Sequence, residues 1–217
     1  MDAASFHAQL QHYYGVRAIA KYFDDMTVHR SSIEGDVLSS FFAYLLPSPR
    51  IHFFPLSFYP LLRSEHGFAP GTAALWDSFH TLAFPVCIGS GLNRPIREAT
   101  YCQGDHFALF VIDREQRQVR VYDSVRSYVQ HDMDVVRHIM EAFECRDFSI
   151  LWNESYEQTD GTNGTDANEC AVYVMRNATF ELSGRTVYEE HDRVFYARAL
   201  KAHFHPVPPP YDLWNTE

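Results

Sequence analysis

Cysteine, glycine and long apolar runs are all scarce in this sequence, and each scarcity excludes a class of protein. The 4 cysteines among 217 residues are too few and too widely spaced for a disulfide framework, and none forms a Cys-x-x-Cys pair. No apolar run approaches the ~20 residues that cross a bilayer. Glycine and proline number only 10 and 11, and no tract is low in complexity, which argues against intrinsic disorder. We therefore expect a globular protein in which each cysteine is a packing residue or a reactive thiol.

Positive charge is also in deficit. There are 18 Lys and Arg residues against 28 Asp and Glu residues, which leaves a formal net charge of −10. Such a balance repels phosphate backbones and anionic lipid headgroups, so neither nucleic acid nor a membrane is an expected partner. The first residues, Met1 to Ala4, lack the basic and apolar regions of a secretory signal. The expected location is a reducing compartment, cytoplasmic or nuclear.

The residues that are abundant can build a core. The sequence is 46% hydrophobic and 15% aromatic, and one domain of this length needs no disulfide or metal to hold its core. Cys102 and His106 have a spacing seen in zinc sites, but no second pair of ligands accompanies them, so no metal is expected. We predict an amino-terminal helical arm over residues 1–30, a main domain over 31–205 and a Pro-rich tail over 206–217.

The hydrophobic pattern changes along the chain from helix-like to strand-like and back. Helices are predicted over residues 37–46, 56–62, 73–80, 134–143, 170–182 and 187–204. Strands are predicted over 51–54, 83–88, 106–113, 118–123 and 148–152. The polar run 114–117 between two of these strands indicates a hairpin. This order of elements predicts an α+β fold, a small central mixed sheet flanked by helices.

Cys170 is the first candidate for chemistry. It follows a polar loop and begins the apolar segment predicted as a helix. The amino end of a helix presents unpaired N–H groups and a partial positive charge, which stabilise a thiolate and can donate to an oxyanion. The alternative is a buried cysteine on the apolar face of the helix, and position alone does not decide between the two.

A nucleophilic thiol needs a base, and the base needs an orienting group. His106 begins the first strand of the predicted hairpin, and Asp123 ends the second. Counting from a turn near Gln116 places these two side chains close to directly opposite each other, within reach of a hydrogen bond. The pair, together with Cys170, predicts a His–Asp–Cys triad.

The sequence around these residues resembles that of a known family. GDHFALFVID, then VRVYDS, then a glutamine and a cysteine before AVYV are similar to the ubiquitin-like-protein-specific cysteine proteases, the Ulp/SENP family in the clan of the adenoviral protease. The segment 37–45 resembles an early helix of that family, and the likeness covers about residues 33–182. It implies a papain-like, adenain-like cysteine protease fold for the main domain.

The resemblance also implies roles for single residues. His106 is the general base, Asp123 its orienting group and Cys170 the nucleophile, and Gln158 donates to the oxyanion. Because the interval from Gln158 to Cys170 is about twice that of the family, Asn163 or Asn168 are alternative amide donors. Phe107 and Trp76 are the aromatic residues expected to bind substrate.

The implied activity is hydrolysis of peptide or isopeptide bonds of a ubiquitin-like modifier such as SUMO, NEDD8 or ubiquitin. No cofactor is required, and the partner is the modifier or its conjugates. Two alternatives stay open at this point. One is a catalytically degenerate module that binds a partner protein through the same site. The other is an acyltransferase of related fold that uses the same three side chains.

Overall fold

The computed structural model describes residues 33, 35–45, 51–56, 58–63, 79–88, 106–125, 129–153, 169–184 and 196. The predicted arm (1–30) and tail (206–217) lie outside these residues, as do nearly all of the helices predicted over 73–80 and 187–204. The proposed domain limits therefore stay predictions. Within the described ranges, no helix has both the length and the apolar character needed to cross a membrane.

Five strands form one mixed sheet. They are β1 (Ile51–Phe53), β2 (Thr81–Ile88), β3 (His106–Asp113), β4 (Gln118–Tyr122) and β5 (Ser149–Asn153). Their spatial order follows the order of the chain. β2, β3 and β4 pair antiparallel, whereas β1 and β5 join the two edges in parallel.

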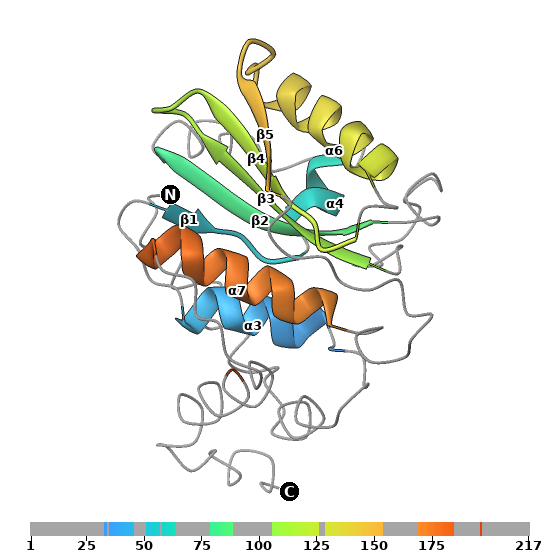
Figure 1. Ribbon diagram of the computed structural model, residues 1–217, viewed down its shortest axis with the longest axis vertical. Coiled ribbons are helices and arrows are strands. Elements are labelled where there is room, and N and C mark those ends of the chain that lie inside the picture. The colour runs from blue at the N-terminus through green and yellow to red at the C-terminus, as the bar shows by residue number, and fades with distance from the viewer. Residues whose placement is uncertain are drawn as a thin grey trace, which may run out of the picture.

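Helices cover both faces of this sheet (Figure 1). α3 (Gly35–Leu45) and α7 (Cys170–Ser183) lie on one face, and α4 (Phe58–Arg63) and α6 (Val129–Ala142) lie on the other. Side chains of β3 alternate between the two cores, as the pleat requires: Leu109 and Val111 pack with α3 and α7, and Phe110 packs with α6. The predicted α+β class with a mixed central sheet is confirmed.

The predicted elements match closely, with one informative exception. β3 has the predicted bounds, β4 stops one residue early, and α7 starts at Cys170 as expected. α6 was predicted to begin at Asp134, but it begins five residues earlier, at Val129. The first turns of α6 are mostly polar in sequence, so their periodicity was not visible.

The register of the β3–β4 hairpin differs from the predicted one. Asp113 pairs with Gln118, which closes a four-residue loop, and this register places Tyr122 opposite Leu109. His106 and Asp123, which were expected close to directly opposite each other, are therefore offset by two residues. The loop itself is the polar run 114–117, as predicted, and Asp113 Oδ1 accepts the backbone N–H of Gln116 within it.

One expectation about the cysteines is also wrong. Cys87 on β2 was expected to be a packing residue or a reactive thiol, but it is disulfide-bonded. Cys145 and Cys170 are free thiols, and both are buried.

α6 ends in a Schellman motif, and the position of that motif that usually holds glycine is occupied by Glu144. The N–H of Cys145 donates to the carbonyl of Met140 at 3.0 Å, and the N–H of Glu144 donates to Glu141 at 3.3 Å. Glu144 has a φ of 52°, in the left-handed region where a side chain costs energy and glycine does not.

We predict that Glu144→Gly stabilises the protein by about 0.5–1 kcal/mol, because relief of the left-handed strain exceeds the entropy glycine loses on folding. For a domain of this size the melting temperature should rise by about 2–4 °C per kcal/mol. Glu144→Ala is the matched control, since it removes the side chain beyond Cβ, as glycine does, but keeps the Cβ that causes the strain. An equal rise in both variants would mean that the backbone conformation is not the cause.

Candidate active site

His106 and Asp123 form a buried pair at one end of the hairpin. Nε2 of His106 lies 2.6 Å from Oδ1 of Asp123, and the side chains are only 4% and 8% exposed. The same Oδ1 accepts the backbone N–H of Val125 at 2.7 Å, which fixes the carboxylate just after β4. The contact is diagonal across the end of the ribbon, because the register offsets Asp123 from His106 by two residues.

Cys170 reaches this pair from another element. It is the first residue of α7 and is 9% exposed. Its thiol is hydrogen-bonded to the His106 side chain. Because Asp123 occupies Nε2, the nitrogen left for Cys170 is Nδ1. The three side chains that the sequence singled out are therefore joined through one imidazole.

The imidazole of His106 is held in its charged form. Burial lowers the pKa of His106, but hydrogen bonds to Asp123 and Cys170 and the negative charges of both outweigh it and raise the pKa to about 9. At neutral pH the site therefore contains an imidazolium next to a sulfur at the positive end of a helix. Such an arrangement suits nucleophilic attack by sulfur and proton delivery by the ring.

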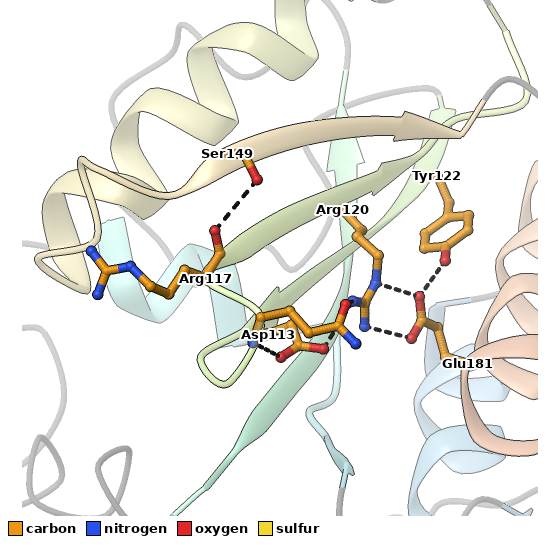
Figure 2. A network of polar contacts seen from close by, with 7 residues as sticks. Asp113, Arg117, Arg120, Tyr122, Ser149 and Glu181 are labelled. Atoms are coloured by element: carbon orange, nitrogen blue, oxygen red, sulfur yellow. Dashed lines mark hydrogen bonds and ion pairs between the residues drawn. The ribbon is translucent and has the colours of Figure 1, made fainter.

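A second polar cluster fixes α7 against the hairpin (Figure 2). Arg120 on β4 donates to both carboxylate oxygens of Glu181 on α7, each at 2.8 Å, and Tyr122 also donates to Glu181. The remaining arm of Arg120 donates to Asp113 Oδ2 at 2.9 Å. β4 and α7 carry or adjoin Asp123 and Cys170, so this cluster contributes to bringing the parts of the site together.

Of the other predicted site residues, Phe107 lies in the part of the chain that the structure describes. Phe107 is half-buried on β3 and packs against the core beneath α3 and α7. Gln158, Trp76 and both alternative amides, Asn163 and Asn168, lie outside the described residues. Among the residues that are described, no group of three or more His, Cys, Asp or Glu side chains is placed to hold a metal ion.

Asp132 is a neighbour of the site that the sequence did not reveal. It lies on α6 and is fully buried, and its carboxyl group interacts with Asp123 and His106. The predicted helix began at Asp134, so Asp132 was expected in a polar segment before it, where an acidic residue is common. The available signal was its spacing from Val135 and Val136, which puts an acid on the apolar face of α6.

Comparison with known proteins identifies the fold. No family model and no curated protein matches the sequence. The Ulp1 protease domain in complex with Smt3, the yeast ortholog of SUMO, gives a TM-score of 0.60 at 18% identity, over 85% of this chain and 80% of that one. A SUMO protease Ulp1 with its catalytic cysteine oxidised to a sulfenic acid gives 0.60 at 17% identity, over 91% and 92%.

A third structure, the Ulp1-like SUMO protease catalytic domain of Chaetomium thermophilum, gives a TM-score of 0.54 at 16% identity, over 82% of this chain and 74% of that one. The chain therefore has the fold of the Ulp/SENP-like cysteine protease domains. The fold implied by the sequence motifs is confirmed.

Proposed function

We propose that this protein is a thiol-dependent peptidase that cleaves peptide or isopeptide bonds of a ubiquitin-like modifier. The observation that carries the proposal is the single imidazole of His106, bonded on one side to Asp123 and on the other to Cys170. In a fold shared with cysteine proteases, this is the geometry of a nucleophile, a base and its orienting group.

Acylation uses the charged pair. The Cys170 thiolate attacks the carbonyl carbon of the scissile bond, and the electron pair of the C=O moves onto oxygen. The backbone N–H groups at the start of α7 donate to this oxyanion, and Gln158 is the proposed side-chain donor. As the C–N bond breaks, the His106 imidazolium gives its proton to the leaving amine, and a thioester remains on Cys170.

Deacylation returns the enzyme to its starting state. Neutral His106 takes a proton from water, whose oxygen attacks the thioester carbonyl. The C–S bond then breaks, which restores the thiolate–imidazolium pair, and the modifier leaves as a carboxylic acid that releases its remaining proton to solvent. Asp123 keeps Nε2 protonated throughout, so Nδ1 is the nitrogen that exchanges protons.

A ubiquitin-like modifier is the proposed substrate for two reasons. One similar structure is a Ulp1 protease domain in complex with Smt3, the yeast ortholog of SUMO. In addition, Phe107 directly follows the proposed base, and Trp76 precedes β2 in the sequence. We propose that these aromatic side chains contact an extended modifier tail. Which modifier is cut is the question for experiment.

The proposal is tested with aminomethylcoumarin conjugates of SUMO, NEDD8 and ubiquitin and with the corresponding vinyl-sulfone probes. We expect one conjugate to be hydrolysed and the matching probe to attach to Cys170. If iodoacetamide alkylates Cys170 but no conjugate or probe reacts, the substrate class is wrong. If Cys170 also resists iodoacetamide, the peptidase proposal fails altogether. Tight modifier binding without turnover would favour a binding module instead.

A further inference from the structure

Asp132 is buried beside the proposed site, and no residue in the described part of the chain donates a hydrogen bond to its carboxyl group. Its side chain is 0% exposed. Among the described residues, neither of its oxygens receives a hydrogen bond, and the same is true of Oδ2 of Asp123. Burying three such oxygens without donors is costly, so the arrangement requires an explanation.

The burial of both carboxyl groups is explained if Asp132 and Asp123 share one proton. Asp132 and Asp123 lie within hydrogen-bonding reach of one another. Two carboxylates are acceptors only and repel, whereas a carboxylic acid donates its O–H to a neighbouring carboxylate. Asp123 is the acceptor in this pair, because its Oδ1 already accepts from His106 and from the N–H of Val125.

We propose that Asp132 is a positioning residue that keeps a proton at neutral pH and donates it to Oδ2 of Asp123, which locks Oδ1 onto the His106 imidazole. The expected effect of Asp132 on kcat rests on the proposed function, whereas its expected effect on the orientation of His106 does not. With Oδ2 held by α6 and Oδ1 held by Val125 and His106, the carboxylate cannot rotate. The ring of His106 is then fixed with Nδ1 toward Cys170.

The electrostatics of the site agree with this geometry. Burial, the charge of Asp123 and the hydrogen bond to Asp123 raise the pKa of Asp132 to about 9, against a smaller opposing effect of His106. Among the described residues, the charged groups that act on Asp132 are thus Asp123 and His106, both from the hairpin side. On its own helix, Asp134 points outward and pairs with Arg137 at 2.8 Å.

The kinetic test compares Asp132→Asn with Asp132→Leu, using the aminomethylcoumarin conjugates above. An asparagine N–H still donates to Asp123, so we expect kcat within about threefold of wild type at pH 7, whereas leucine lowers kcat by roughly 10–100-fold with little change in KM. His106 and Asp132 both lose protons near pH 9, so the alkaline decline of kcat/KM should be shallower in Asp132→Asn, where only His106 titrates. Asp134→Asn is the control and should match wild type.

A second measurement needs no substrate and separates this inference from the proposed function. NMR titration of the His106 ring should give a pKa of about 9 in wild type and in Asp132→Asn. In Asp132→Leu it should fall toward the ordinary value of about 6.5. That result upholds the positioning role even if no modifier is cleaved. Equal titration of His106 in both variants, or equal losses of kcat in both folded variants, would overturn it.

Discussion

Cys170→Ala is expected to lower kcat/KM for the modifier conjugate by at least about 10⁴-fold. The nucleophile carries the covalent step, and removal of one member of such a set costs nearly as much as removal of all of them. Cys170 is the first residue of α7, so alanine fits the helix and leaves the fold intact. Steady-state kinetics on the purified variant, with circular dichroism to confirm folding, measure the effect.

The same comparison requires a cysteine control, and Cys145 supplies it. Cys145 is a free thiol that is 3% exposed in the core beneath α6, and burial raises its pKa. We expect Cys145→Ala to keep its activity and iodoacetamide to modify Cys170 in preference to Cys145. His106→Ala should be as inactive as Cys170→Ala, and the double variant no worse, because the two side chains act as one unit. Activity that survives in Cys170→Ala would refute the assignment of the nucleophile.

The sequence predicted the parts of the site that depend on local pattern. The continuous apolar run after His106 defined β3, and the change from a polar loop to an apolar segment placed Cys170 at the start of α7. Both signals are contained within a few residues of the feature they predict. The contact of His106 with Asp123 was also expected, although the register behind that expectation was displaced by two residues.

What the sequence missed depends on contacts between distant elements. Asp132 escaped notice because an acid among polar residues does not suggest a buried position. Its burial is explained only by Asp123, which is brought against it when α6 packs on the sheet. Such pairings have no local periodicity, so a single sequence carries little trace of them.

The second large effect is expected from Arg120, in the cluster that joins β4 to α7. Arg120 is 13% exposed, and it faces Asp113 and Glu181, which are 9% and 7% exposed. We predict that Arg120→Met lowers the free energy of unfolding by about 3–5 kcal/mol, since it leaves two buried carboxylates without their cation. Urea denaturation at pH 7 measures this change.

Glu181→Gln is the informative partner variant. It leaves Arg120 paired with Asp113, and the amide oxygen can still accept from Arg120 or Tyr122, so the expected loss is only about 1–2 kcal/mol. Arg137→Met serves as the exposed control, because Arg137 and Asp134 are 63% and 54% exposed and such surface pairs contribute under about 1 kcal/mol. Equal losses for Arg120→Met and Arg137→Met would contradict the role assigned to the cluster.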